Sequence, residues 1–364
     1  VLSGTPYPQL MIAETSENIT INFSMDMDTE SLSDSTLRVF GRWSGPASGS
    51  ISWENGDSTL IFDPDEDFMN GEWIMVSLSK EIASQSGVNI ENGYAWNYWI
   101  KTEPGTLLQT EIDIIEVRYP EEDPITCYGA YAGDINNDGF SDLSVINEHS
   151  NDVRLFLNDG SGGYDDFEAF DLLNGNTPSP NEGGDFNNDG IIDLAIANTL
   201  NDQVSILMGD GIAGFIEEES YTADMNVRGI GIIDSDADGD DDILTANRVG
   251  NTMSLLLNDG TGSFGDPINF ETSANTESGI AIADANEDGI MDVFRAGFNS
   301  EEVILMLGNG SNGYSFQDQA DVTGHPWMIT VGDVNNDGHV DVVSSNSNGN
   351  KVAVILGDGQ GNLG

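Results

Sequence analysis

Five short acidic segments share one pattern, and their residue types and spacing suit the binding of a metal ion. Each reads D-x-[DN]-x-D-G-x-x-D, and the copies begin at Asp134, Asp185, Asp234, Asp284 and Asp333. Oxygen ligands at positions 1, 3 and 5, a main-chain carbonyl at position 7 and a carboxylate at position 9 can surround one hard cation, and calcium takes about 6–8 such oxygens. Magnesium requires a more rigid octahedron, while zinc and copper prefer His and Cys side chains. The pattern therefore predicts calcium.

The predicted ligands occupy the same five positions in each copy. Position 6 is always glycine, because the chain must turn sharply there and a side chain would obstruct the turn. Position 7 would contribute only its main-chain carbonyl, so the ring of His339 is not a predicted ligand. An EF-hand loop begins in the same way, but it needs a Glu at position 12, where no copy has an acidic residue. The candidate metal ligands are Asp134, Asn136, Asp138, Phe140, Asp142, Asp185, Asn187, Asp189, Ile191, Asp193, Asp234, Asp236, Asp238, Asp240, Asp242, Asp284, Asn286, Asp288, Ile290, Asp292, Asp333, Asn335, Asp337, His339 and Asp341.

The near-constant spacing of the loops indicates a structural repeat. Their first residues are 51, 49, 50 and 49 positions apart, which argues against acidic turns that arose by chance. A strand-length apolar run precedes each loop, as in 228–233, and another follows, as in 193–198. A third run ends in a Gly-rich turn, where Asn-Gly and Asp-Gly pairs supply positive φ angles, and a weaker fourth run follows. Four antiparallel strands in about 50 residues predict a blade of a β-propeller.

Loop, flanking strands and Gly-rich hairpin together resemble the FG-GAP or VCBS-type repeat, over roughly residues 107–364. The family occurs in the calcium-binding propeller of integrin α-subunits and in many secreted bacterial proteins, and it binds calcium at the rim between the first two strands of a blade. The resemblance implies about five calcium sites at the residues above. Family propellers more often have seven blades, so either five blades close the ring or the sequence is the front part of a longer chain, which family habit favours. Residues 111–118 read as an outer strand that could complete the last blade.

The first hundred residues predict a different domain. Short alternating runs at 19–23, 36–40, 58–62 and 73–78 indicate an antiparallel β-sandwich. The segments 23–28 and 94–102 resemble those of bacterial Ig-like domains. Aromatic residues at 94–99 either close the sandwich core, the commoner use, or form a platform for sugars. The Glu-Pro-Gly sequence at 103–105 marks the predicted boundary, which gives an Ig-like domain over 1–104 and a propeller over 105–364, an all-β protein.

Charge limits the partners and the compartment. The chain has 10 Lys and Arg residues against 64 Asp and Glu residues, a formal net charge of −54. We expect no nucleic-acid partner, because phosphates must be neutralised by basic residues and this chain has few. The sequence has no run of 18 apolar residues, so we also expect no insertion into a membrane. The acidic loops should repel themselves without a cation, and cytosolic calcium is too scarce to fill weak loops, so we expect a secreted or cell-surface protein. The single cysteine, Cys127, is expected to be a buried apolar residue.

The sequence does not favour catalysis. It contains no G-x-S-x-G, H-E-x-x-H or P-loop motif, and its three histidines are expected to be structural. We predict no catalytic residue and no cofactor besides calcium. The favoured function is that of a secreted, calcium-stabilised recognition or adhesion module that binds a protein or glycan through propeller or sandwich loops. One alternative is a structural subunit that assembles into an extracellular filament or surface layer, and another is the noncatalytic part of a polysaccharide-degrading enzyme.

Overall fold

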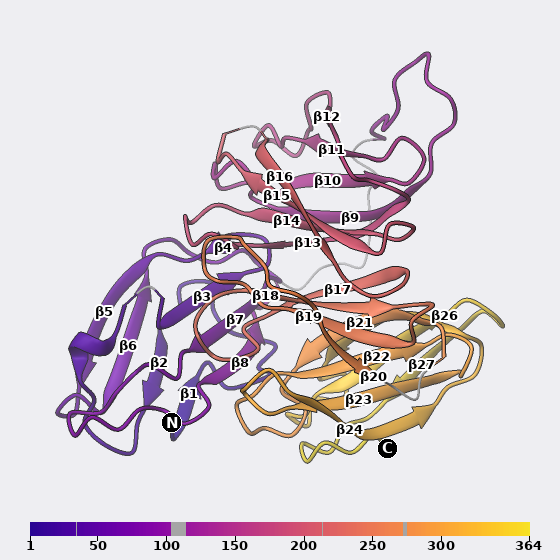
Figure 1. Ribbon diagram of the computed structural model, residues 1–364. Coiled ribbons are helices and arrows are strands. Elements are labelled where there is room, and N and C mark those ends of the chain that lie inside the picture. The colour runs from indigo at the N-terminus through magenta and orange to yellow at the C-terminus, as the bar shows by residue number, and fades with distance from the viewer. Residues whose placement is uncertain (34, 103–113, 213, 272–274) are drawn as a thin grey trace.

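A computed structural model describes residues 1–33, 35–102, 114–212, 214–271 and 275–364. In these ranges the chain forms strands, bridges and turns, with one short 3-10 helix, η1 (Thr29–Ser31). None of the described helices is long and apolar enough to cross a membrane. Figure 1 shows an N-terminal group of strands beside a larger group of similar four-stranded sheets. The all-β class predicted from the alternating apolar runs is confirmed.

The N-terminal part is a sandwich of two sheets. In sheet order, the first consists of β1 (Ser3–Thr5), β2 (Ile19–Asn22), β6 (Thr59–Pro64) and β5 (Gly49–Glu54), and the second of β4 (Gly45–Pro46), β3 (Leu37–Gly41), β7 (Trp73–Leu78) and β8 (Tyr94–Trp99). Alternate residues such as Ile21, Leu60 and Ile74 are fully buried in a shared core. Trp96 and Tyr98 belong to the same core, so the aromatic residues of the last strand contribute to its closure.

Five further sheets follow in chain order, and we call them blades 1 to 5. Their strands are β9 (Cys127–Gly133), β10 (Asp142–Asn147), β11 (Asp152–Phe156), β12 (Glu168–Asp171), β13 (Pro178–Gly184), β14 (Asp193–Asn198), β15 (Gln203–Gly209), β16 (Phe215–Thr222), β17 (Val227–Ile233), β18 (Asp242–Asn247), β19 (Thr252–Leu256), β20 (Ile268–Glu271), β21 (Glu277–Ala283), β22 (Asp292–Gly297), β23 (Glu302–Gly308), β24 (Tyr314–Asp321), β25 (Pro326–Gly332), β26 (Asp341–Asn346) and β27 (Lys351–Ile355). Blades 1 to 4 have four antiparallel strands, and three are described in blade 5. Each acidic loop joins the first and second strands of its blade.

The blades pack face to face along the chain. First strands of successive blades are neighbours, from β9 to β13, β17, β21 and finally β25. The second strands of blades 2, 3 and 4 are fully enclosed, since every residue of β14, β18 and β22 is buried. Their apolar side chains fill the spaces between blades, which explains why these strands read as nearly continuous apolar runs. The propeller-like arrangement is confirmed, whereas the total number of blades in the ring stays a prediction.

Three details differ from the sequence-based expectation or lie outside the described residues. Residues 114–118 form no strand, and the Val117 carbonyl accepts a hydrogen bond from Arg154 of β11 (2.5 Å), so this segment lies against blade 1 and does not complete blade 5. Residues 111–113 of that predicted strand, and the boundary predicted at 104–105, fall outside the described residues. Cys127 is exposed, because it begins β9 at the edge of its sheet, and the expectation of burial was wrong.

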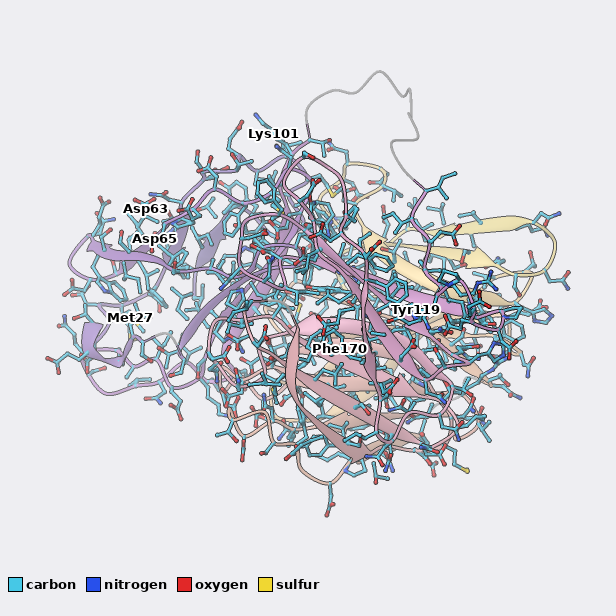
Figure 2. All side chains as sticks on the ribbon, turned by 90° about the horizontal axis from the view of Figure 1, so that it is seen from above. Met27, Asp63, Asp65, Lys101, Tyr119 and Phe170 are labelled. Carbon is cyan, nitrogen blue, oxygen red and sulfur yellow. The ribbon has the colours of Figure 1, made fainter. Side chains whose placement is uncertain are left out.

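The sandwich is seated on the blades at the ends that carry the acidic loops. The N–H of Asp134 in the first loop donates to the carbonyl of Trp43, and the N–H of Ala95 donates to the carbonyl of Gly289 in the fourth loop, both at 2.7 Å. In Figure 2 the sandwich, marked by Met27, lies beside the repeat sheets. A cavity of about 550 Å³ between the two parts is lined largely by apolar residues. Further polar contacts between the two parts lie on the blades themselves, where Arg42 pairs with Glu182 of β13 at 2.8 Å and the Tyr131 hydroxyl of β9 donates to the Arg42 carbonyl at 2.6 Å.

Candidate metal centre

One pattern of main-chain hydrogen bonds shapes all five acidic loops. In the third loop, Asp234 at position 1 accepts from the N–H groups of Asp238 (3.0 Å) and Gly239 (3.1 Å). Asp242 at position 9 accepts from the N–H of Ser235 (3.0 Å) and from an N–H where the third strand ends (2.9 Å). The same four bonds recur in the other loops. The first and last carboxylates of each loop are therefore held on the inside of the turn.

Backbone conformation makes the turn tight enough for this. The residue at position 4 has a positive φ in every loop, for example 57° at Ala237, and the glycine at position 6 does too, for example 101° at Gly239. Glycine tolerates this region without steric cost, and Asn, which stands at position 4 in three loops, tolerates it better than most residues. The turn brings residues two to eight positions apart close together, as in the third loop, where Asp234, Asp236 and Asp242 converge.

The third loop gathers the most compact acidic group among the described residues. Carboxylate oxygens of Asp234, Asp236 and Asp242 lie within 4.8 Å of one another. Asp236 also has a buried oxygen, Oδ1, with no hydrogen-bond partner. Buried oxygens normally have a partner, so an unsatisfied one beside two other carboxylates suits the coordination of a cation. A donor set made only of oxygen suits a hard ion such as calcium.

The other four loops differ at position 3, where asparagine replaces aspartate. There the amide Nδ2 donates to the carboxylate at position 5, at 2.8–3.0 Å, and so takes up one of its oxygens. At position 7, the main-chain N–H of Phe140, Ile191, Asp240, Ile290 and His339 donates to the same position-5 carboxylate. Each predicted side-chain ligand lies in the turn of its own loop. Among the described residues, only the third loop brings three carboxylates within 4.8 Å of one another. Calcium binding stays a proposal at all five loops.

Burial makes several of these carboxylates reluctant to ionise. It is the largest cause of the raised pKa of Asp234, about 8, and the neighbouring Asp238 adds to it by repulsion. Burial likewise raises the pKa to about 8 in Asp292, to about 7 in Asp193 and Asp284, and to about 6 in Asp142 and Asp185. Asp337 in the exposed fifth loop has a lowered pKa, chiefly because it accepts the N–H of His339. A cation bound in the first four loops would favour the ionised form of these carboxylates and lower their pKa values.

The sandwich forms direct hydrogen bonds with the third loop. Lys80 Nζ donates to the carbonyl of Asp236 at 2.6 Å and lies 3.9 Å from its carboxylate. The carbonyl of the next residue, Ala237, accepts from both Ser79 Oγ and the Lys80 N–H, each at 2.8 Å. Three bonds from two successive sandwich residues therefore fix the main chain between two predicted ligands.

A buried arginine secures the other half of the same loop. Arg38 Nη1 donates to the carbonyl of Gly239 (2.9 Å), and Nη2 donates to the carboxylate of Asp241 (3.2 Å). The contact is close, because a Cβ atom at Gly239 would lie only 1.8 Å from the carbonyl oxygen of Ser35. Sequence reasoning did not predict the roles of Arg38 and Lys80. The available signal was composition: with ten basic residues against 64 acidic ones, each Lys or Arg is a candidate partner for an acidic loop.

The histidines occupy separate polar contacts. His149 Nδ1 lies 2.9 Å from Thr126 Oγ1, and His325 Nδ1 lies 2.8 Å from the carbonyl of Phe298. His339 Nδ1 contacts the carboxylate of Glu287 at 2.5 Å, which raises the pKa of the His339 ring. This contact joins the fourth and fifth acidic loops through side chains and leaves the His339 ring outside the predicted ligand set.

Comparison with known families agrees with this architecture. The FG-GAP-like repeat matches four overlapping segments, at 134–196, 185–245, 234–295 and 284–344, and a bacterial Ig-like domain matches 1–99. The fold and the loops thus define a repeat protein with propeller-type blades and an Ig-like domain in front. Because the repeat matches span more than half of the sequence, the chain belongs to the FG-GAP-like repeat family.

More distant similarities add no functional assignment. No curated protein matches significantly. Among solved structures, an Agrocybe aegerita lectin described as recognising non-reducing terminal N-acetylglucosamine is 16% identical, with coverage of 100% of this chain and 92% of the lectin and a TM-score of 0.45. A Lactobacillus plantarum protein is 14% identical (90% and 94% covered, TM-score 0.49), and a Pseudomonas aeruginosa periplasmic gluconolactonase is 13% identical (90% and 94% covered, TM-score 0.47). These values are too low to transfer an activity.

Proposed function

We propose that the protein is a secreted, calcium-stabilised recognition or adhesion module that binds a protein or glycan ligand. The observation that carries this proposal is the third acidic loop, where three carboxylates converge and the Ig-like domain grips the loop from outside. A cation there would neutralise charge that is buried against another domain, and would hold together the two parts that form the binding surface. Broad loop faces on rigid blades are common places for ligand recognition.

Calcium binding can be tested by titration calorimetry of metal-free protein. The variant that combines Asp236→Ala with Asp238→Ala should lose the third site alone, because both side chains lie in that loop. A matched control combines Glu54→Ala with Asp63→Ala, which removes the same charge from exposed positions of the sandwich. If the first variant binds as many calcium ions as the wild type, the assignment of the third loop is wrong.

Stability provides a second measurement of the same proposal. Calcium bound only to the folded state should stabilise it by about 2.7 kcal/mol per site at a hundredfold excess over the dissociation constant. Chelation should therefore lower the melting temperature, and added calcium should restore it. An identical melting curve with and without chelator would contradict a stabilising role. Ligand recognition itself is tested with arrays of glycans and of extracellular proteins, each probed with calcium and with chelator.

Self-assembly into a filament or layer is the second candidate, and blade 5 favours it. β27 pairs with β26 on one side, and no strand of the described residues pairs with its other side. Val352 and Val354 on this strand are 65% and 55% exposed. Exposed edge strands of this kind can pair with another chain. Electron microscopy in calcium should show ordered polymers that Val354→Lys abolishes, whereas particles that stay single would exclude this candidate.

A further inference from the structure

Arginine and aromatic side chains gather at the ends of the blades opposite the acidic loops. Arg228 is the second residue of β17, and Arg248 directly follows β18, whereas the third acidic loop joins the other ends of these two strands. Tyr128 near the start of β9, Trp327 near the start of β25 and Phe298 after β22 surround them. We call these five residues the arginine–aromatic cluster. It brings side chains from blades 1, 3, 4 and 5 together.

One of the two arginines already has an acidic partner. Arg228 Nη1 donates to Glu148 Oε1 at 2.8 Å, and its guanidinium carbon lies 4.6 Å from the centre of the Tyr128 ring. The Tyr128 and Trp327 rings meet edge to face, with their centres 6.2 Å apart. Two buried donors nevertheless remain unused in the described part of the chain. Arg228 Nε and the Tyr128 hydroxyl have no hydrogen bond of ordinary geometry there.

The second arginine contacts aromatic rings and no acidic side chain of the described residues. The guanidinium carbon of Arg248 lies 5.0 Å from the centre of the Trp327 ring and 5.4 Å from that of Phe298. The side chain has no hydrogen bond or ion pair with any described residue, although the sequence contains 64 acidic residues and only ten basic ones. Partial burial and the nearby Arg228 lower the pKa of Arg248, which shows that the two positive charges act on each other. A partly buried cation of this kind lacks a counter-ion.

We propose that the arginine–aromatic cluster is a binding site for a carboxylate carried by a small, ring-shaped ligand. Arg248 would bind the carboxylate with its planar fork of N–H groups, and the Tyr128 hydroxyl, with the free Nε of Arg228, would supply further donors. The Trp327 ring would pack against the body of the ligand. A single carboxylate fits better than a sulfated or phosphorylated polymer, because the net charge of −54 repels each additional negative charge.

This site is independent of the acidic loops and can be tested apart from them. Calorimetric titrations of the wild type with sodium benzoate and with sodium glucuronate would distinguish an aromatic acid from a sugar acid. Benzamide and methyl glucoside are their neutral counterparts. We expect at least one carboxylate to bind saturably, with or without calcium, and its neutral counterpart not to bind. If neither acid binds to the wild type at millimolar concentrations, the proposal is overturned.

Variants then locate the site. Arg248→Gln should weaken binding about tenfold or more, because a charge-assisted pair of hydrogen bonds is lost. Arg118→Gln is the matched control. Arg118 is exposed, and its Nη1 donates to the carbonyl of Glu122, outside the arginine–aromatic cluster. Trp327→Leu keeps both charges but removes the ring, and it should weaken binding even if Arg248→Gln fails to fold. Equal affinity in the wild type and in a folded cluster variant would refute the assignment.

Discussion

The ammonium group of Lys80 in the Ig-like domain donates a 2.6 Å hydrogen bond to the main-chain carbonyl of Asp236 in the third acidic loop. The bond goes to the main chain, and the carboxylate of Asp236 still places one oxygen within 4.8 Å of carboxylate oxygens of Asp234 and Asp242. The Ig-like domain thus orders the main chain of the loop and leaves its side chains free to bind a cation. Domain docking and metal binding are consequently linked at this loop, because each favours the same loop conformation.

Loss of the buried arginine at this interface should destabilise the protein. Arg38 and Asp241 are about nine-tenths buried, and Arg38→Met would leave the carboxylate of Asp241 without its partner. Breaking a buried ion pair of this kind costs about 3 kcal/mol. Calorimetric unfolding in calcium should show a lower melting temperature than the wild type, while Arg118→Met, at an exposed site, should leave it unchanged. A wild-type melting curve for Arg38→Met would show that the interface is not stabilising.

Two equivalent glycines separate the effect of the interface from that of the backbone. Gly239 and Gly338 both stand at position 6 with positive φ, 101° and 90°, so alanine is strained at either position. A Cβ at Gly239 would meet the carbonyl of Ser35 in the Ig-like domain, whereas one at Gly338 would meet nothing within 4 Å. Gly239→Ala should therefore be the more destabilising by about 1–3 kcal/mol, the usual cost of overpacking. Equal losses in thermal unfolding would mean that the domains are not in contact there in solution.

Calcium should remove the pH dependence of stability that Asp234 causes in the metal-free protein. Burial raises the pKa of Asp234 from 3.8 to about 8, so the metal-free folded state holds a proton there that the unfolded chain releases. Between pH 6 and 8 the folded state therefore binds more protons, and its free energy of unfolding falls as pH rises. Calcium binds the ionised carboxylates, so calcium binding should strengthen over the same range.

Calorimetric unfolding of metal-free and calcium-loaded protein at pH 6 and pH 8 measures both trends. The difference in melting temperature between the two forms should widen at pH 8. Asp234→Asn removes one of the groups that titrate in this range and should make the trend of the metal-free protein less steep. A metal-free wild type that becomes more stable from pH 6 to pH 8 would contradict the raised pKa.

Exchange of the residue at position 3 should transfer the properties of one loop to another. Asn136→Asp replaces an amide that donates to Asp138 with a fourth carboxylate, at the position that Asp236 occupies in the third loop. We expect tighter calcium binding at the first loop, because an additional charged ligand adds affinity. Asp236→Asn should weaken the third site in the same measure. Calcium titrations of both variants check this, and unchanged affinities would show that position 3 does not determine the order of the sites.

The sequence predicted the blades and the loops because both are local features. A loop of nine residues between two short strands is specified by glycine, aspartate and apolar spacing within about 50 residues. The main-chain bonds around Asp234 and Asp242 follow from that spacing alone. The position of residues 114–118 could not be predicted from such local features, since a strand-like composition does not determine which blade the segment contacts.

The interface between the domains was beyond sequence reasoning for a similar cause. Arg38 and Gly239 are 201 positions apart, and no periodic pattern relates them. The arginine–aromatic cluster is also non-local, since Tyr128 and Trp327 come from different blades. Both features depend on how complete units are placed against each other, which is determined by shape and charge at surfaces that the local pattern does not describe.

The seating of the Ig-like domain on several loops has a mechanical consequence. One sheet of that domain and the turns beside it bind main-chain atoms of the first, third and fourth loops, through Trp43, Lys80 and Ala95. Tension applied to the N-terminal domain would thus be shared among three blades and would not peel away a single one. Because the load is distributed over several contacts, we expect the Ig-like domain to resist mechanical separation from the blades.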